Sequence, residues 1–406
     1  MKNLLVGQSG GPTAVINSSL YGVIKEFLTL KEDNARAYGM LHGIEGFLNG
    51  DIVDLEKEFE EQSLELLKNT PGAYLGSCRY KLPNDLDDPV YETLFQKLEA
   101  LDIGYFLYIG GNDSMDTVSK LSRYAEKRQN PIRIIGIPKT VDNDLVLTDH
   151  TPGFGSAAKY VASTVREIGI DVSVYDTESV TIIEIMGRHA GWLTAASILA
   201  RKFENDNPLL IYLPETAFDE NEFLAKLESA FTHTKNVVVC ISEGVQDKDG
   251  KFICEYTSSV ETDSFGHKKL AGAARYLETL VNSRLNKKVR SIEFSLTQRC
   301  SSIIQSLADV NEAVNAGSFG IKGAINGETG SMVACKRISN EPYELAYEMV
   351  DVNLVCNQEK TIPLSWITKD GTDLSEEFIA YVKPLIQGET VTPTKDGLPL
   401  FAYRKK

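Results

Sequence analysis

The chain has 406 residues, of which 42% are hydrophobic and 24% are charged, a composition typical of a globular protein with two or three structural domains. Its formal net charge of −15 argues against general nucleic-acid binding, which needs a positive field to attract phosphates. No run of about 18 uncharged apolar residues occurs, so we predict no membrane span and no membrane partner.

The six cysteines lie far apart and form no C-x-x-C pair. This spacing argues against a disulfide framework and against a structural zinc site, and it predicts reduced thiols in a cytoplasmic protein. The first residues, MKNLLVGQSGG, predict a short buried strand and a glycine turn instead of a signal peptide, because the apolar part is too short.

Apolar runs rich in Ile, Val and Leu alternate with helical patterns along most of the chain. The expected strands are residues 3–8, 105–111, 132–138, 179–187, 208–214, 236–244, 289–296 and 330–338. The expected helices are residues 15–28, 114–127, 190–203, 221–234, 271–285 and 301–317. Short strands separated by helices indicate parallel sheets buried on both faces, so we predict an α/β fold of the doubly wound type.

Unusual polar residues stand where five of the predicted strands end. These segments are Ser9–Gly11, Gly110–Ser114, Lys139–Asp144, Met186–His189 and Ser242–Gly244. In open α/β sheets, ligands bind beyond the carboxyl ends of the strands. One polar strand end is ordinary turn chemistry, but five of them together predict a binding site.

Glycines follow the first two of these strands. Gly10–Gly11 could hold an anion at backbone N–H groups and a helix N-terminus, although a plain tight turn is an equal alternative. Gly110–Gly111 repeats the arrangement, with Asn112 and Asp113 just before a helix. Helix capping is the simpler interpretation of that loop, and a phosphate cradle with an oxygen ligand for Mg²⁺ is the other.

The third segment combines Lys139 with Asp142 and Asp144. A carboxylate can act as general base towards a hydroxyl, and an ammonium can neutralise a transferring phosphoryl group. A loop of solvated charges is the alternative. Arg188 could grip a phosphate or a sugar phosphate, or pair at a turn, and Glu243 could accept hydroxyl hydrogen bonds or cap a turn.

The histidines show no ligand spacing. His189 is expected to make structural hydrogen bonds, and no role is expected for the other four, which are His42, His150, His233 and His267.

From near residue 1 to about residue 340, the chain resembles the phosphofructokinase family. The resemblance rests on eight motifs that occur in the family's order, which are GQSGGPTAVIN, GSCR, GGNDS, PKTVDND, TPGFGSAA, MGRHAGW, SEG and QR. The resemblance implies two Rossmann-like three-layer (αβα) domains with a cleft between them. It implies phosphoryl transfer to the 1-hydroxyl of fructose 6-phosphate. It also implies a donor domain at 1–153 and about 300–340, a sugar-phosphate domain at 154–299 and about 341–390, and a loosely attached tail at 391–406.

Two positions bear on the phosphoryl donor. Members that use ATP typically have glycine where Asp113 and Lys139 stand here, and this pairing resembles the pyrophosphate-dependent branch. An Asp side chain in the first loop would intrude on the α-phosphate of a nucleotide by its size and its charge. Pyrophosphate ends before that point, and Lys139 can supply positive charge to the leaving phosphate.

The resemblance also assigns roles to single residues. Catalysis is assigned to Asp142, Lys139, Thr140 and Asp144. Donor binding is assigned to Gly10, Gly11, Gly110, Gly111, Asp113 and Ser114, with Asn112 at Mg²⁺. Sugar-phosphate binding is assigned to Thr140, Val141, Asp142, Met186, Gly187, Arg188, Glu243, Arg290 and Arg299, with Arg79 and Lys81 as further candidates.

Arg290 is expected to come from a neighbouring subunit, so the resemblance implies a homo-oligomer, either a dimer or a tetramer. Three positions depart from the family pattern, because Asn112, Ser179 and Leu296 stand where many members have an aspartate, an arginine and a histidine. Two alternatives therefore stay open. One is an ATP-dependent 6-phosphofructokinase that tolerates Asp113, and the other is a non-catalytic sugar-phosphate-binding member of the fold.

Overall fold

The computed structural model describes residues 1–32, 34–203, 205–256 and 272–404. Contacts between Cα atoms divide the chain into two compact units. Unit 1 comprises Met1–Ser156, Arg299–Glu359 and Ile386–Lys406, and unit 2 comprises Ala157–Gln298 and Lys360–Leu385. The assignment of a donor and a sugar phosphate to separate domains stays a prediction.

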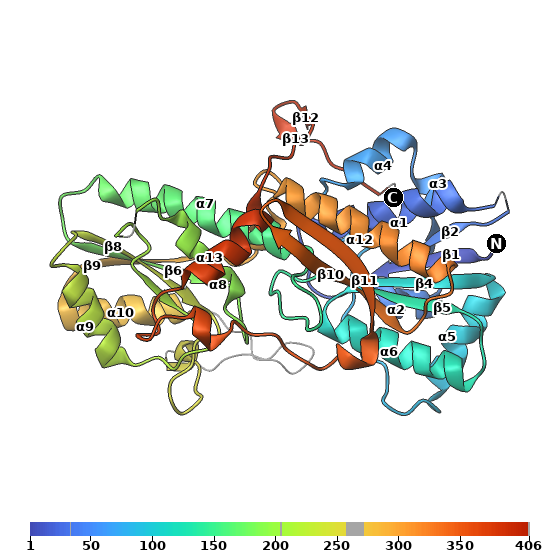
Figure 1. Ribbon diagram of the computed structural model, residues 1–406, viewed down its shortest axis with the longest axis horizontal. Coiled ribbons are helices and arrows are strands. Elements are labelled where there is room, and N and C mark those ends of the chain that lie inside the picture. Colours follow the sequence, from blue (N-terminus) through green and yellow to red (C-terminus); the bar gives the residue numbers. More distant parts are fainter. Residues whose placement is uncertain (33, 204, 257–271, 405–406) are drawn as a thin grey trace. The chain divides into compact units, whose positions relative to one another are not determined.

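Unit 1 is built on a seven-stranded sheet in the order β11-β10-β5-β4-β1-β2-β3 (Figure 1). Its strands are β1 (Asn3–Gln8), β2 (Ala37–Met40), β3 (Ile52–Asp54), β4 (Ile103–Gly110), β5 (Arg133–Pro138), β10 (Ser331–Asn340) and β11 (Tyr343–Asp351). The five inner strands run parallel, and the edge strands β3 and β11 are antiparallel to their neighbours. Parallel inner strands bring the carboxyl ends of β1, β4 and β5 to one edge of the sheet.

Helices cover both faces of this sheet. The helices are α1 (Ile16–Leu30), α2 (Gly43–Asn49), α3 (Leu55–Glu58), α4 (Glu61–Leu67), α5 (Pro89–Ala100), α6 (Asn112–Lys127) and α12 (Leu307–Ile325). Figure 1 shows α1 and α12 on one face and α2, α5 and α6 on the other. Alternate residues of β1 follow this division, because Leu4 and Val6 pack into one buried cluster and Leu5 into the other. Unit 1 is therefore a three-layer αβα structure.

Helices α1 and α12 approach each other at glycines. A Cβ atom added at Gly22 would lie 2.0 Å from the carbonyl oxygen of Val314, and one at Gly317 would lie 2.1 Å from that of Ser19. Both distances are far below van der Waals contact, so no larger residue fits at either position. The first helix of the chain is thus packed backbone to backbone against a helix some 300 residues later.

Unit 2 has a four-stranded, fully parallel sheet in the order β7-β8-β6-β9. Its strands are β6 (Ser179–Ile185), β7 (Leu210–Tyr212), β8 (Asn236–Ser242) and β9 (Lys288–Glu293). Its helices are α7 (Phe154–Ser173), which begins in unit 1, α8 (Trp192–Ala195), α9 (Glu220–Ala230), α10 (Ala273–Leu285) and α13 (Glu376–Val382), and the four-residue α11 (Thr297–Cys300) lies at the unit boundary.

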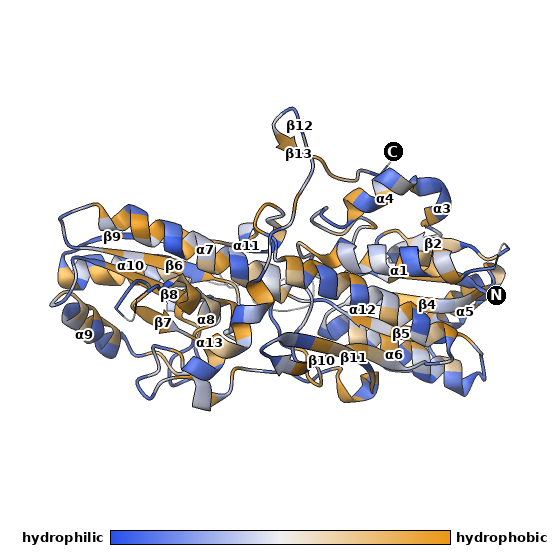
Figure 2. Ribbon diagram, turned by 45° about the horizontal axis from the view of Figure 1, so that its top comes forward, coloured by the Kyte–Doolittle hydropathy of each residue, from blue (hydrophilic) through white to orange (hydrophobic). Residues whose placement is uncertain are grey.

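The α/β fold with parallel sheets is confirmed in each unit. The strands β1, β5, β6 and β8 are buried almost throughout, whereas β9 and β11 at the sheet edges are partly exposed, and Figure 2 shows helices that carry both colours. That pattern is expected where strands are buried on both faces and helices on one. The structure shows no disulfide among the six cysteines, all of which lie within the described residues. Among the residues that the structure describes, no helix has the length and apolar character to span a bilayer.

Two segments differ from the sequence prediction, and a third extends beyond the described residues. Residues 190–203 form only the short α8 and a 3₁₀ helix at Ala196–Ala200 instead of one continuous helix. The helix expected at 301–317 begins at Leu307, after the hydroxyl of Ser306 accepts a hydrogen bond from the Asp309 amide, and it ends at Ile325. Of the helix expected at 271–285, residue 271 lies outside the described residues.

The last residues, expected as a loose tail, form a two-residue hairpin of β12 (Thr394–Lys395) and β13 (Leu398–Pro399). Beyond the hairpin, Ala402 is buried in the unit 1 core, and its amide donates to the hydroxyl of Thr70 at 2.9 Å.

Candidate active site

Three of the predicted loops meet at the carboxyl ends of neighbouring strands in unit 1. In the sheet, β4 lies between β1 and β5, with Gln8 paired to Ile109 and Gly110 to Pro138. The amide of Lys139 donates to the carbonyl of Gly110 at 3.0 Å, which joins two of the loops directly. The structure therefore brings together the residues predicted to bind the donor and those predicted to be catalytic.

The glycines after β1 leave room for cationic side chains. Gly10 has a φ of 75°, which favours glycine, and a Cβ atom there would lie 3.4 Å from the Lys139 Nζ. A Cβ atom at Gly11 would lie 3.1 Å from Nη1 of Arg299. The Nζ of Lys139 donates a hydrogen bond of 2.6 Å to the carbonyl of Gly11. An ammonium and a guanidinium thus face the same glycine turn.

Lys139 is buried, and its ammonium titrates at an unusual pH. Burial lowers the pKa of Lys139 to about 8. The carboxylates of Asp142 and Asp144 oppose this shift, because they attract the charge. The guanidinium groups of Arg299 and Arg79 lower the pKa further by repulsion. Three cations therefore gather around this turn, an arrangement that suits an anion of several charges.

Asp142 and Asp144 form a pair of carboxylates on the loop after β5, residues 139–144, which we call the catalytic loop. Burial and the nearby Asp142 carboxylate raise the pKa of Asp144 to about 7. The Oδ1 atom of Asp144 is buried and finds no hydrogen-bond partner among the described residues. The amide of Asp142 donates to the Thr140 hydroxyl at 3.1 Å, and that hydroxyl lies 3.4 Å from Oδ2 of Asp142.

The pair fits a divalent cation. A buried carboxylate oxygen without a partner, beside a second carboxylate, supplies the hard oxygen ligands that Mg²⁺ prefers. Among the described residues, no group of three His, Cys, Asp or Glu side chains could hold a metal by itself. A cation here would need further oxygens from a phosphate ligand, as is usual for Mg²⁺.

Asn112, the predicted metal ligand, lies at the start of α6. Its Oδ1 accepts a hydrogen bond of 2.6 Å from the amide of Asn357, and its Nδ2 donates to the carbonyl of Gln358. The side chain thus fastens the helix to residues 357–358. Its role at a metal stays a prediction.

Asp113 and Ser114 occupy the first turn of α6. The Nζ of Lys81 lies 3.5 Å from Oδ1 of Asp113, and both side chains are about half exposed. A Cβ atom at Gly110 would lie 1.9 Å from the hydroxyl of Ser114, so only glycine fits before this helix. Lys81 and Arg79, proposed as helpers for the sugar phosphate, lie with the donor residues in unit 1.

The predicted sugar-binding residues of unit 2 follow two adjacent strands. Ile185 pairs with Ser242, so Met186, Gly187 and Arg188 begin beside Glu243. Backbone hydrogen bonds join the two loops. The Glu243 amide donates to the Ile185 carbonyl at 3.0 Å, and the Gly244 amide donates to the Gly187 carbonyl at 3.2 Å.

Close contacts add to these hydrogen bonds. A Cβ atom at Gly244 would lie 1.9 Å from the carbonyl oxygen of Arg188. The structure therefore presents Arg188 and Glu243 from one rigid backbone assembly.

Two arginines lie elsewhere. Arg290 is exposed on β9 opposite Thr181, near the start of β6, whereas Arg188 follows the end of β6. Arg299 belongs to unit 1, where it contributes to the cationic cluster at Gly11. Their predicted roles at the sugar 6-phosphate stay predictions.

Sequence reasoning missed two residues that shape these loops. Gln298 precedes Arg299 in the QR motif, and its Oε1 accepts a hydrogen bond of 3.2 Å from the amide of Met186. Asn143 lies between the two aspartates with a φ of 54°, and its Oδ1 accepts a hydrogen bond from the Thr151 amide. Asn is one of the few residues that tolerate a positive φ, so its place between the two aspartates could have indicated a turn of this kind.

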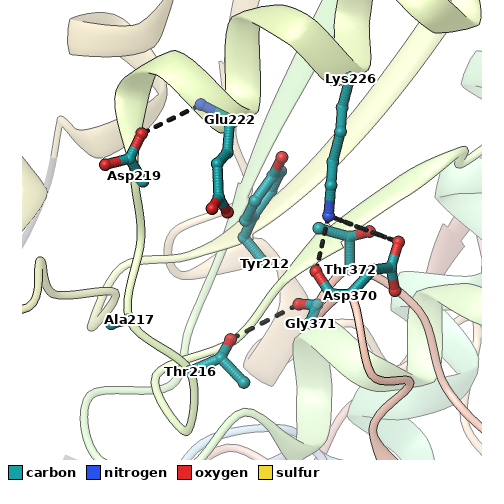
Figure 3. Close-up of a pocket in the computed structure, with 9 residues that line it drawn as sticks. All are labelled: Tyr212, Thr216, Ala217, Asp219, Glu222, Lys226, Asp370, Gly371 and Thr372. Atoms are coloured by element: carbon teal, nitrogen blue, oxygen red, sulfur yellow. Dashed lines mark hydrogen bonds and ion pairs between the residues drawn. The ribbon is translucent and has the colours of Figure 1, made fainter.

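A hollow elsewhere in unit 2 contains none of the predicted site residues. Figure 3 shows it between the end of β7, the start of α9 and residues 370–372, with Lys226 bonded to Asp370 and Thr372. The hydroxyl of Tyr212 is buried there. The predicted chemistry does not depend on this hollow.

Comparisons with known proteins show which family the chain is similar to. A model of the family described as phosphofructokinase matches residues 3–302. The chain is 42% identical over 407 residues to the pyrophosphate–fructose 6-phosphate 1-phosphotransferase of Xanthomonas campestris pv. campestris, a match covering 99% of this chain and 96% of the relative. It is 39% identical over 407 residues to the enzyme of the same name from Halomonas elongata, with 100% and 96% covered. The crystal structure of a pyrophosphate-dependent phosphofructokinase from Marinobacter aquaeolei has a TM-score of 0.90 and 36% identity, with 100% of this chain and 96% of that chain covered.

Proposed function

The chain belongs to the phosphofructokinase family, and on this premise we propose that it is a pyrophosphate-dependent 6-phosphofructokinase. It transfers a phosphoryl group from pyrophosphate to the 1-hydroxyl of fructose 6-phosphate, giving fructose 1,6-bisphosphate and phosphate. Four relatives with this activity in their names match at least 94% of the chain. The reaction is readily reversible, because pyrophosphate hydrolysis releases less free energy than ATP hydrolysis, and it serves glycolysis and gluconeogenesis.

The observation that carries the donor assignment is the buried ammonium of Lys139 on the Gly11 turn. Lys139 stands where ATP-using relatives typically have glycine, and its Nζ lies 2.6 Å from the carbonyl of Gly11. Arg79 and Arg299 lie close enough to lower its pKa. Three cations around one turn suit a compact ligand such as pyrophosphate, whose charge is concentrated on two phosphates.

Asp113 supports the same donor. Its carboxylate occupies the first turn of α6, where a nucleotide would place its α-phosphate, and like charges repel there. The Lys81 ammonium lies 3.5 Å from this carboxylate. Pyrophosphate has no third phosphate to meet it.

In the proposed mechanism, pyrophosphate lies against Gly10–Gly11 and Gly110–Gly111. Asp142 accepts the proton of the sugar 1-hydroxyl, whose oxygen attacks the near phosphorus in line. The bridging P–O bond breaks, and phosphate leaves with the electron pair. Lys139 and Thr140 stabilise the phosphoryl group during transfer, because their ammonium and hydroxyl lie on the same loop as the base.

A divalent metal, which we take to be Mg²⁺, neutralises charge on the pyrophosphate oxygens when it is bound. Asp144 is the residue best suited to face it, because its Oδ1 is buried without a partner. A cation beside Asp144 would also relieve the repulsion from Asp142 that raises the pKa of Asp144.

Unit 2 supplies the residues proposed to bind the sugar phosphate. Met186, Gly187, Arg188 and Glu243 lie on the two interlocked loops after β6 and β8. The guanidinium of Arg188 suits a phosphate, and the carboxylate of Glu243 suits sugar hydroxyls. Arg290 is exposed, which is compatible with a contribution to a second copy in a homo-oligomer. Cysteines that form no disulfide in the structure are compatible with a cytoplasmic location.

A donor assay tests the proposal. The purified protein is given fructose 6-phosphate and Mg²⁺ with either pyrophosphate or ATP, and fructose 1,6-bisphosphate is measured. We expect turnover with pyrophosphate and little with ATP. A clear preference for ATP would contradict the donor assignment, and ligand-induced thermal stabilisation without turnover would support a non-catalytic binding protein.

A double variant tests the residues behind the donor choice. Asp113→Gly with Lys139→Gly should abolish pyrophosphate use and allow some turnover with ATP. Unchanged pyrophosphate activity in that variant would refute the roles given to both residues.

A further inference from the structure

His150, for which the sequence predicts no role, lies at the centre of a buried charged network in unit 1. Its Nδ1 lies 2.7 Å from Oδ1 of Asp149, and its Nε2 lies 2.7 Å from Oε2 of Glu312. Only 1% of the His150 surface is exposed. Each ring nitrogen therefore faces a carboxylate oxygen at the distance of a charge-assisted hydrogen bond.

Both carboxylates have a further partner, Asp149 at the same oxygen that faces His150 and Glu312 at its other oxygen. Arg337 on β10 donates to Asp149 from Nε at 3.0 Å and from Nη2 at 2.8 Å. The hydroxyl of Tyr343 on β11 donates to Oε1 of Glu312 at 2.6 Å. Two carboxylates and one guanidinium leave one negative charge over, which a protonated imidazole balances.

Only an imidazolium has N–H groups on both ring nitrogens. A neutral His150 would turn one lone pair towards a carboxylate at 2.7 Å, which is repulsive. The Glu312 and Asp149 carboxylates raise the pKa of His150 to about 9, although burial opposes this shift. The other titratable groups near Glu312 are Asp309 on α12, Cys335 on β10 and Tyr347 on β11.

The residue after His150 holds the catalytic loop. The hydroxyl of Thr151 donates to the carbonyl of Thr140 at 2.9 Å, and its amide donates to Oδ1 of Asn143 at 3.1 Å. Thr140 also forms a β-bridge with Gly153. Asn143 connects Asp142 to Asp144, so the position of Thr151 fixes the backbone from which both carboxylates extend.

We propose that the imidazolium of His150, clamped between Asp149 and Glu312, is a positioning residue that holds the catalytic loop in its active geometry. The clamp anchors residues 149–151 to α12, β10 and β11, and Thr151 passes this placement to Thr140 and Asn143. A loop with two nearby carboxylates is under electrostatic repulsion. Because residues 149–151 are anchored, the loop cannot move so as to separate the two carboxylates. This role rests on the proposed function of Asp142 as the general base.

His150→Gln removes the positive charge and keeps one donor. We expect kcat with pyrophosphate to fall about ten-fold or more, because small misplacements of catalytic groups are costly. The KM of either substrate should change less than about two-fold, since neither is proposed to touch His150. The exposed His233 gives the matched control, and His233→Gln should leave both constants unchanged. A His150→Gln enzyme with wild-type kcat and a lowered Tm would overturn the proposal.

A second variant separates charge balance from packing. His150→Gln with Glu312→Gln removes the carboxylate that the first change leaves unpaired. We expect kcat to recover to within about three-fold of wild type, because the network is again neutral. Recovery of Tm without recovery of kcat would overturn the positioning role.

The charge of His150 can be measured without turnover. In protein labelled with ¹³C-histidine, the His150 Cε1 resonance is identified by its absence from His150→Gln. It should keep the imidazolium shift from pH 6 to 8. A midpoint below pH 8 would overturn the proposal, and this result does not depend on the donor, so it is distinguishable from a failure of the proposed function.

Discussion

The catalytic loop after β5 and the loops after β6 and β8, residues 186–188 and 243–244, all follow the carboxyl ends of strands but are stabilised in different ways. We call the second pair the paired loops. The catalytic loop carries titratable groups with displaced pKa values, namely the buried ammonium of Lys139 and the carboxyl of Asp144. The paired loops are held mainly by backbone bonds and by glycine contacts at Gly187 and Gly244.

The two regions differ in whether their polar groups are compensated before a ligand binds. Buried charges without full compensation destabilise a fold, and they become favourable only when a ligand of opposite charge arrives. Backbone hydrogen bonds are satisfied before any ligand binds. The catalytic loop is thus expected to trade stability for reactivity, while the paired loops are expected to lose both binding and stability when disturbed.

The largest expected effect is at Asp142, the proposed general base. Asp142→Asn should lower kcat about 10²- to 10⁴-fold, because an amide cannot accept the hydroxyl proton. KM should change little, and Tm should stay or rise, since one of two repelling carboxylates is removed. Steady-state kinetics and thermal unfolding check this, with the exposed Asp396→Asn as the control. A large loss of Tm would mean that the loop is built for stability after all.

The next largest effect is expected from a substitution that disturbs the paired loops. Gly244→Ala should raise the KM for fructose 6-phosphate about ten-fold or more, because the new Cβ would lie 1.9 Å from the Arg188 carbonyl and push the loops apart. Overpacking of this kind costs about 1–3 kcal/mol, so Tm should fall by several degrees.

Gly169→Ala is the control for this change, since its Cβ would have 3.8 Å to the nearest atom. Equal KM values for the two variants would show that the paired loops are not rigid.

A smaller effect concerns Lys139 and pH. The pKa of Lys139 falls from 10.5 in the unfolded chain to about 8 in the folded protein. Below pH 8 the side chain is charged in both states, and burying that charge lowers the free energy of unfolding. Lys139→Met should therefore raise stability at pH 7, by at most about 3 kcal/mol. The gain should shrink between pH 8 and 10.5 and vanish above.

Thermal unfolding at pH 7 and pH 10 measures this change, and turnover with pyrophosphate should be lost at both. A variant less stable than wild type at pH 7 would show that Asp142 and Asp144 fully compensate the ammonium.

The smallest effect is at the half-exposed pair of Lys81 and Asp113. Exposed ion pairs contribute about 0–1 kcal/mol, so Lys81→Met should leave Tm within about one degree. The KM for pyrophosphate should rise less than about three-fold, and the change should disappear in high salt. A KM change of ten-fold or more would place Lys81 directly on the donor.

Sequence alone predicted most strands and the edge at which β1, β4 and β5 end, because buried parallel strands have a strong apolar signal. It could not predict that residues 190–203 break into short helical turns. The helical pattern there, with Trp192, Leu193, Ile198 and Leu199, is the same for a continuous helix and for two short ones. Tertiary packing, with Trp192 stacked near Phe378 and Tyr381, decides between them.

In the site, sequence could propose residues whose side-chain type indicates a chemistry, such as Asp142 and Arg188, and their roles stay predictions. It missed His150, because Asp149 is adjacent in sequence but Glu312 and Arg337 are more than 160 residues away. It also could not place Arg299 beside Gly11, since that proximity arises only when the chain returns to unit 1. Long-range partners leave no local pattern to find.

The backbone contact between α1 and α12 has a consequence for synthesis on the ribosome. Helix α1 is made within the first 30 residues, yet its partner ends at Ile325, so the first unit cannot close its core until most of the chain has emerged. The sheet of the second unit lies wholly within residues 157–298 and is complete before that partner is made. Domains fold as units during translation. Unit 2 is complete once residues 360–385 are made, whereas unit 1 also includes residues after 385. Unit 1 is therefore expected to be the last to fold, and the apolar face of the nascent α1 is expected to stay exposed to chaperones until α12 is made.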